Sequence, residues 1–310
     1  MIVDTHVHIT EGFRGQTGSG PTKSLTYGRF QQGKSKVQFL PPLNAGKTAF
    51  EPEMLLRFMD LAGVDKAVLL QGTFYGDQND YVHKAASQWP DRLIASAYLD
   101  PRSDNVREDF RKIRDDYGLK ILKFEMSELV GLTGLYPDLR LDGEEFAWIW
   151  EEADKQELIV TLDLGQPRTR AYQTDAVGEI LKRHPSVRIV IAHLGQPPIA
   201  QAQDGALNKL WEEQILLGRH PNVWFDTAAL PAYCSEADED YPYPTALGYV
   251  RRAAELIGAE KIMWGTDIPG LLMHATYLQL LEMVRRHCNF FSEEQMTKVL
   301  GASAELVYGG

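Results

Sequence analysis

The sequence predicts an α/β protein, a (β/α)8 TIM barrel with a long lid insertion after its first strand. Apolar segments alternate with amphipathic helical segments along most of the 310 residues. Several apolar segments are continuous, as in a parallel sheet that is covered on both faces. Charged residues follow these segments at the strand ends, where such barrels carry their chemistry. We therefore expect one domain, residues 1–310.

The first strand is expected within the opening stretch MIVDTHVHIT. Residues 2–8 are rich in β-branched side chains, which favour strands. Because successive side chains of a strand point to opposite faces, Asp4, His6 and His8 are expected to share one face. Two imidazoles on one face near a strand end can both reach a single metal ion.

A long stretch, residues 10–50, follows this strand and is rich in Gly, Ser, Thr, Gln and Pro. It is expected to be irregular, and an irregular loop of this length is usually functional or disordered. We expect a lid that closes over the barrel mouth and binds a substrate carboxylate. Arg29, between Tyr27 and Phe30, is the first candidate because arginine holds a carboxylate bidentately. The alternatives are Lys23, Lys34 and Lys36.

From residue 52 onward, helices and strands alternate. PEMLLRFMDLAG predicts an amphipathic helix with Pro52 near its start and Gly63 at its end. Strands are expected over 66–71, 93–100, 119–125, 158–165, 188–195, 222–228 and 261–267. Further helices are expected over 78–89, 104–117, 144–156, 173–184, 205–218, 245–257, 274–287 and 293–304, the last with a capping box of Ser292 and Gln295.

With the first strand, these segments give the βα count of a (β/α)8 barrel. The main alternative is a doubly wound open sheet. That fold normally carries a glycine-rich fingerprint after an early strand, and the sequence has none.

Polar residues gather at the predicted strand ends. Such groups are costly to bury unless they are paired or bind a metal, and their presence on six strands is hard to explain as scaffolding. Asp267 has an alternative as a turn former, His193 as a core histidine and Lys123 as a partner of Glu125, while Asp226 is expected to make structural hydrogen bonds. The full set is His6, His8, Lys123, Glu125, Asp163, His193, Asp226 and Asp267.

Composition narrows the class of protein. The net charge is −11 and the isoelectric point is about 5.3, which disfavours nucleic acids and anionic membranes as partners. Cys234 and Cys288 are the two cysteines, too few for a disulfide framework, so a cytoplasmic location is expected. The sequence shows no secretory signal and no apolar run of the roughly 18 residues that a transmembrane helix needs.

The ordered motifs DTHVH, LKF, IVIAHLGQP and KIMWGTDIP resemble the amidohydrolase superfamily, in particular its amidohydrolase-2 branch. The resemblance implies one divalent metal ion, Zn or Mn, although some lactonases of this kind work without one. It implies that His6 and His8 are metal ligands and that Asp267 is a ligand or the proton-transferring carboxylate. His193 would polarise the substrate or position the attacking water. Dimers are common among such barrels, and a homodimer is expected by analogy.

One position departs from the pattern of the branch. The branch normally has a histidine at the end of the fifth strand, where this chain has Asp163. A carboxylate can replace imidazole as a ligand for Zn or Mn. Alternatively, Glu125 completes the ligand set and Asp163 is not a ligand, or the site binds metal poorly.

The leading functional expectation is a metal-dependent hydrolase that activates water against a small carboxylated cyclic or aromatic substrate. Lys123 is expected, with Arg29, to bind that substrate. The alternative is a non-oxidative decarboxylase of a hydroxybenzoate-like acid, which would use the same residues. A TatD-like nuclease is disfavoured by the charge of −11 and by the missing strand-five histidine. The remaining alternative is a non-catalytic barrel that senses a small acid.

Overall fold

The structure, a computed structural model, describes residues 1–42, 45–235 and 237–309. Two parallel sheets form its centre. One has the order β1–β6–β7 and the other the order β13–β12–β11–β10–β9–β8. Their bounds are β1 Val3–Val7, β6 Lys66–Leu69, β7 Leu93–Ala95, β8 Ala97–Tyr98, β9 Ile121–Glu125, β10 Ile159–Asp163, β11 Arg188–Ile191, β12 Val223–Asp226 and β13 Ile262–Met263.

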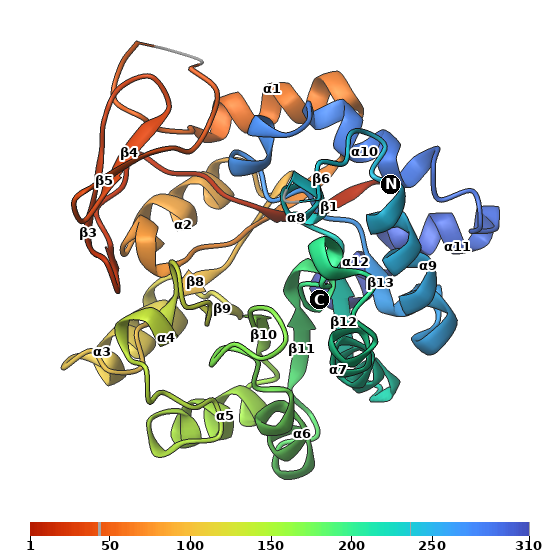
Figure 1. The fold of residues 1–310 in the computed structure, drawn as a ribbon. Coiled ribbons are helices and arrows are strands. Elements are labelled where there is room, and N and C mark those ends of the chain that lie inside the picture. Colours follow the sequence, from red (N-terminus) through yellow and green to blue (C-terminus); the bar gives the residue numbers. More distant parts are fainter. Residues whose placement is uncertain (43–44, 236, 310) are drawn as a thin grey trace.

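The two sheets form one closed ring. β7 and β8 are successive segments of a single strand position, interrupted at Ser96, and they join the sheets on one side. On the other side, the Thr5 amide donates to the Trp264 carbonyl and the His8 amide donates to the Ile268 carbonyl. Figure 1 shows the helices outside this ring of strands. The predicted (β/α)8 barrel is confirmed.

The outer helices largely match the predicted ones. They are α1 Pro52–Ala62, α2 Asn79–Gln88, α3 Val106–Arg111, α5 Glu144–Lys155, α6 Thr174–Arg183, α7 Gly205–Ile215, α9 Pro244–Ile257 and α10 Tyr277–Arg285. Shorter helices are α4 Leu132–Leu135, α8 Leu230–Ser235, α11 Glu293–Thr297 and α12 Ser303–Tyr308. None of the helices in these described ranges is long and apolar enough to cross a bilayer.

Local sequence explains where several helices begin and end. α1 starts at Pro52, and Gly63 caps its end with a φ of 72°, a left-handed conformation that glycine adopts without strain. Ser292 and Gln295 form the predicted capping box at the start of α11. The predicted helix over 104–117 ends in a π-helical turn at 112–116, and the one over 293–304 is interrupted by a π-helical turn at 298–302.

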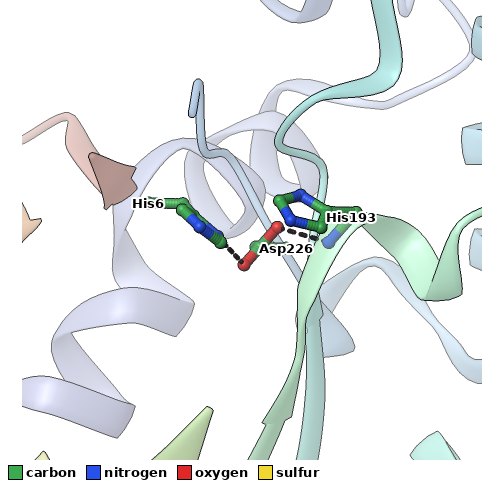
Figure 2. A group of neighbouring side chains, drawn as sticks. All are labelled: His6, His193 and Asp226. Atoms are coloured by element: carbon green, nitrogen blue, oxygen red, sulfur yellow. Dashed lines mark hydrogen bonds and ion pairs between the residues drawn. The ribbon is translucent and has the colours of Figure 1, made fainter. Parts of the chain in front are cut away.

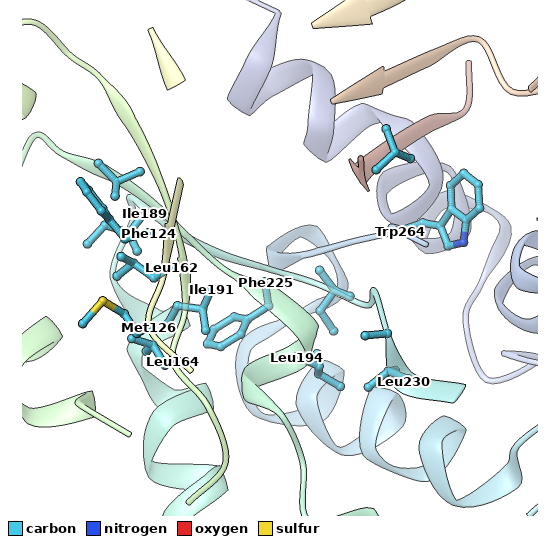
Figure 3. Close-up of a cluster of buried hydrophobic side chains, with 14 of the residues drawn as sticks. Phe124, Met126, Leu162, Leu164, Ile189, Ile191, Leu194, Phe225, Leu230 and Trp264 are labelled. Atoms are coloured by element: carbon cyan, nitrogen blue, oxygen red, sulfur yellow. The ribbon is translucent and has the colours of Figure 1, made fainter. Parts of the chain in front are cut away.

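The apolar residues form an outer and an inner layer. Alternate residues of β9 to β12 face the helices, and Figure 3 shows Phe124, Leu162, Ile191 and Phe225 among them. The other set fills the barrel interior and contacts α12, whose residues close the barrel at the end opposite the strands' carboxyl ends. This inner set includes Val3, Val68, Ile121, Ile159, Val190, Trp224, Met263, Val307 and Tyr308.

The segment after β1 differs from the expected irregular loop. It contains an antiparallel sheet of β2 Gln16–Thr17, β3 Gly20–Ser24, β4 Arg29–Gln32 and β5 Ser35–Gln38. The prediction was wrong because these strands are short and polar and are joined by tight turns at Gly28 and Gly33, where φ is positive. In Figure 1 this sheet stands at one side of the ring, beside α1 and α2. Its closure over the barrel mouth stays a prediction.

Candidate active site

The inward-facing residues of the barrel strands change from apolar to charged toward the carboxyl ends. On β9, Ile121 is followed on the same face by Lys123 and Glu125, and on β12, Trp224 is followed by Asp226. All three charged side chains are buried. The sequence therefore builds an apolar floor and a charged mouth, and the mouth is the candidate site.

The first strand is irregular, which corrects one expectation. Its register shifts between Asp4 and Val7, and Asp4 does not join the histidines. Instead, its carboxylate accepts hydrogen bonds from the Thr266 hydroxyl at 2.6 Å and from the Tyr277 hydroxyl of α10 at 3.0 Å. The strict alternation expected for Asp4, His6 and His8 was wrong, although both histidines do reach the mouth.

Two buried acceptors orient the histidines. His6 Nδ1 lies 2.9 Å from Asp226 Oδ2, as Figure 2 shows, and His8 Nδ1 lies 2.9 Å from the Leu70 carbonyl oxygen. Each Nδ1 therefore carries the proton and donates it to its acceptor. Each Nε2 therefore keeps its lone pair as an acceptor, the arrangement that orients metal-binding histidines.

Asp267 completes this group from the segment after β13. Its backbone has a φ of 64° and its amide donates to the His6 carbonyl at 2.7 Å, so the turn brings its side chain to the histidines. Asp267 Oδ1 lies 2.9 Å from His8 Nε2 and 3.8 Å from His6 Nε2. The side chain is 24% exposed, so solvent reaches the carboxyl group.

The chemistry of this donor set fits a divalent cation. Burial lowers the pKa of both His6 and His8, which favours neutral imidazoles. With both Nδ1 atoms protonated, two nitrogen lone pairs and a carboxylate oxygen face one another, and such acceptors repel without a cation between them. Asp267 Oδ1 lies 2.9 Å from His8 Nε2 and 3.8 Å from His6 Nε2, so one small ion could contact all three donors.

A second group, His6, His193 and Asp226, also has ligand atoms within 4.8 Å of one another. Here both carboxylate oxygens of Asp226 are already satisfied. Asp226 Oδ1 accepts the backbone amides of His193 at 2.8 Å and Ala228 at 3.0 Å, and its Oδ2 binds His6. Asp226 therefore orients His6, and His6, His8 and Asp267 are the candidate metal group.

Lys123 is a buried cation in contact with this group. Its Nζ donates to His6 Nε2 at 3.0 Å and lies 3.5 Å from Glu125 Oε2. The same His6 lone pair cannot bind Lys123 and a metal ion together. A bound cation would therefore require the ammonium to turn toward Glu125.

His193 reaches the site through a sharp turn after β11. His193, Leu194, Gly195 and Gln196 all have positive φ, a run of strained conformations of the kind that clusters at functional sites. His193 Nε2 donates to Asp163 Oδ2 at 3.1 Å, and Gln196 Nε2 donates to the other carboxylate oxygen. His193 Nδ1 is buried and has no hydrogen-bond partner within the described residues.

The buried pair of Asp163 and His193 is strongly polarised. Burial alone would lower the pKa of His193, but the charge of Asp163 raises this pKa to about 9. Burial alone would raise the pKa of Asp163, but His193 and Lys123 hold it well below its ordinary range. Burial, followed by the charge of Asp163, raises the pKa of Glu125 to about 8. Asp163 therefore carries the negative charge and His193 the positive charge at neutral pH.

The structure brings together most of the residues that the sequence predicted. His6, His8 and Asp267 form one group, and His193, Asp163, Glu125 and Lys123 surround it, but Asp163 and Glu125 lie outside both candidate metal groups. Arg29 is exposed, and its Nε donates to the Thr26 carbonyl at 3.3 Å. Sequence reasoning missed Gln196. It expected structural hydrogen bonds at Asp226, which the structure shows, but did not name His6 as a partner.

The fold and this site place the protein among barrel enzymes that use histidines and acids at the strand ends. The chain belongs to the amidohydrolase family, because the Amidohydro_2 model, described as Amidohydrolase, matches residues 3–310. A curated relative, L-fucono-1,5-lactonase of Burkholderia ambifaria, is 27% identical over 252 residues, covering 77% of this chain and 78% of that protein.

Solved structures share the fold across the full chain. An amidohydrolase of Burkholderia multivorans with bound zinc has a TM-score of 0.73 at 16% identity, covering 100% of this chain and 99% of that one. A probable 2-pyrone-4,6-dicarboxylic acid hydrolase of Acinetobacter baumannii has a TM-score of 0.69 at 15% identity, with the same coverage.

Proposed function

We propose that the protein is a metal-dependent hydrolase that opens a small cyclic ester, a lactone, by attack of water. The observation that carries this proposal is the convergence of His6 Nε2, His8 Nε2 and Asp267 Oδ1 at the barrel mouth. The relative that is named a lactonase supports the choice of a cyclic ester. The structure with bound zinc supports the choice of metal.

Asp267 is the residue that would move the proton. A divalent ion held by His6, His8 and Asp267 would supply Lewis acidity and lower the pKa of bound water. Asp267 Oδ1 faces His8, which leaves Oδ2 to accept the proton of the attacking water. As the ring opens, the same oxygen returns the proton to the leaving alkoxide, so one carboxylate serves as base and then as acid.

His193 would stabilise the negative charge that develops on the carbonyl oxygen. Its Nε2 is held by Asp163, and its buried Nδ1 has no partner among the described residues. Because Asp163 keeps the ring protonated, Nδ1 is a charged donor aimed by a rigid turn. Such a preorganised donor is worth most at an oxyanion. Gln196 holds the second oxygen of Asp163 and so fixes the pair.

The support for a carboxylated substrate is weaker than the sequence suggested. Phe30 is buried while its neighbour Arg29 is exposed, so the two side chains lie on opposite faces of β4. Non-oxidative decarboxylation would use the same residues around the metal and is the alternative that the assay must separate. No observation on the described residues favours a nuclease or a sensor.

The test is a substrate panel given to the purified, zinc-supplied protein. Lactones, amides and hydroxybenzoates are scored for acid release and for CO2. We expect acid release from lactones without CO2. The double variant His6→Ala/His8→Ala should lose both metal and turnover, whereas His83→Ala/His184→Ala, outside the site, should keep both. CO2 release without lactone hydrolysis, or full metal occupancy in the first variant, would contradict the proposal.

A further inference from the structure

A cavity of about 450 Å³ lies at the end of the barrel opposite the candidate active site. Ile121 and Ile159, the first residues of β9 and β10, line it together with Tyr308 of α12, the helix that closes this end. Its volume is within the range of small-molecule sites, about 300–1,000 Å³. It shares no residue with either candidate metal group, so it is a separate concavity of the fold.

The wall of this cavity is mostly apolar and partly aromatic. Ala86 of α2 and Leu93 of β7 line it, and so does Tyr117, whose ring stacks on the His83 imidazole with ring centroids 4.8 Å apart. An apolar molecule gains free energy by leaving water for such a surface. The wall therefore favours a ligand with an apolar or aromatic body.

The charged residues of the cavity are all of one sign. Lys120 and Arg188 line it, and none of the lining residues in the described part of the chain is Asp or Glu. Neither cation forms an ion pair within the described ranges, whereas the adjoining acid Asp80 of α2 is paired with Lys84. In a chain with a net charge of −11, a cavity that carries only positive charge favours an anion.

Arg188 is held in place by backbone atoms. Its Nη1 donates to the Val307 carbonyl at 2.8 Å and its Nη2 donates to the Glu157 carbonyl at 3.1 Å. These bonds use two of the five N–H groups of a guanidinium, and the other three have no partner among the described residues. Because both acceptors are neutral, the positive charge of Arg188 is not compensated. A fixed guanidinium of this kind is suited to bind a carboxylate through two parallel hydrogen bonds.

We propose that this cavity is a second binding site, which takes a small organic acid with an apolar or aromatic body and one carboxylate. The carboxylate bonds Arg188 and faces Lys120, and the body of the ligand packs on the apolar wall beside Tyr117. The proposal is independent of lactone hydrolysis, because it uses none of the residues at the barrel mouth. A neutral molecule of the same shape should bind more weakly, since it leaves the two cations without a partner.

The test is a fluorine NMR titration of para-fluorobenzoate into the full-length protein supplied with zinc. The neutral para-fluorobenzyl alcohol, which has the same ring, is titrated in parallel. We expect the acid to bind at least about tenfold more tightly than the alcohol, the range for hydrogen bonds to a charged group. The double variant His6→Ala/His8→Ala should bind the acid equally well, which separates this cavity from the candidate metal group.

Two positions in the cavity test the contribution of charge. Arg188→Met should weaken binding of the acid by about 10- to 100-fold and leave the alcohol unaffected. Ser87 is an exposed residue of α2 that lines the cavity, so it can be changed without disturbing the core. Ser87→Glu places a negative charge beside the cations and should weaken binding of the acid about 2- to 5-fold. The matched control Ser87→Gln has nearly the same shape without the charge and should leave both affinities unchanged.

The inference is overturned if the wild type does not prefer the acid, or if Ser87→Glu and Ser87→Gln bind it equally well. Full affinity in a folded Arg188→Met protein would also contradict it. If Arg188→Met does not fold, the two Ser87 variants decide the matter alone. Loss of binding in His6→Ala/His8→Ala would place the acid at the candidate metal group and refute the second site.

Discussion

His6 and His8, the proposed metal ligands, owe their orientation to single acceptor atoms. His6 Nδ1 is held by Asp226 and His8 Nδ1 by the Leu70 carbonyl. The motif DTHVH was enough to predict that both histidines reach the barrel mouth, and their role as metal ligands stays a prediction. It could not predict the acceptors, since one lies 220 residues away in the sequence and the other is a backbone atom.

The variant Asp267→Asn tests the proposed role of the Asp267 carboxylate in proton transfer. The amide is nearly the same size and still offers an oxygen to the metal, but it cannot carry a proton. We expect kcat for lactone hydrolysis to fall by about 10²- to 10⁴-fold, the usual contribution of acid–base catalysis. Metal analysis should show most of the metal retained. The exposed control Asp91→Asn should be unaffected, and a wild-type rate in Asp267→Asn would move the proton transfer elsewhere.

Lys123→Met tests whether the buried ammonium opposes metal binding. Lys123 Nζ occupies the His6 lone pair at 3.0 Å, and two unit charges about 4 Å apart near a protein surface interact by about 4 kcal/mol. Methionine keeps the apolar stem without the charge. We expect zinc affinity, measured by competition with a chelator, to rise at least about tenfold.

The matched control for this variant is Lys120→Met, an exposed residue just before β9. It should leave zinc affinity unchanged. Weaker zinc binding by Lys123→Met would mean that Lys123 supports the cation instead of competing with it.

At the scale of elements, the sequence predicted long periodic segments well and short irregular ones poorly. α1 and its glycine cap follow directly from local residues. The turn over 193–196 could not be predicted, because three of its non-glycine residues adopt left-handed conformations that only the surrounding contacts enforce. The sheet β2–β5 was missed because its strands are short and polar and are joined by tight turns.

The aromatic face of this sheet is what attaches it to the site. Phe30 stacks on Phe13 at 4.5 Å, and Phe13 stacks on Tyr75. A side chain at Gly270, three residues after Asp267, would meet the Phe39 ring. The sheet is thus packed on the two segments that carry Tyr75 and Asp267.

Phe30→Ala should therefore loosen the sheet. Truncating a buried phenylalanine typically costs about 3–5 kcal/mol, and this small cluster has few other contacts to compensate. We expect faster amide exchange over residues 20–38, unchanged exchange in the barrel strands and a raised KM. Arg29→Ala, on the exposed face of the same strand, should change none of these. A raised KM for an acidic substrate in Arg29→Ala alone would support the carboxylate-binding role expected from the sequence.

At the scale of the whole molecule, the count of βα units predicted the barrel, but the way the ring closes was not predictable. Closure depends on Asp4, whose carboxylate accepts the Thr266 amide and hydroxyl and the Tyr277 hydroxyl. The shift in the β1 register directs Asp4 to these partners. No periodicity in the sequence marks that shift.

Asp4→Ala should destabilise the whole barrel. It leaves several buried donors without an acceptor, and each unsatisfied group costs about 1–3 kcal/mol. We expect the free energy of unfolding in urea to fall by on the order of 3 kcal/mol, with Asp91→Ala as an exposed control. A change within about 0.5 kcal/mol, the usual range for surface substitutions, would show that Asp4 does not secure the closure.

The central claim is that His6, His8 and Asp267 hold one divalent ion on which hydrolysis depends. The most direct measurement is a zinc titration of chelator-treated protein in which bound zinc and lactone hydrolysis are recorded together. We predict negligible hydrolysis without metal and a linear rise in activity that ends at one zinc per chain. Undiminished hydrolysis by protein that contains no measurable metal would contradict the claim.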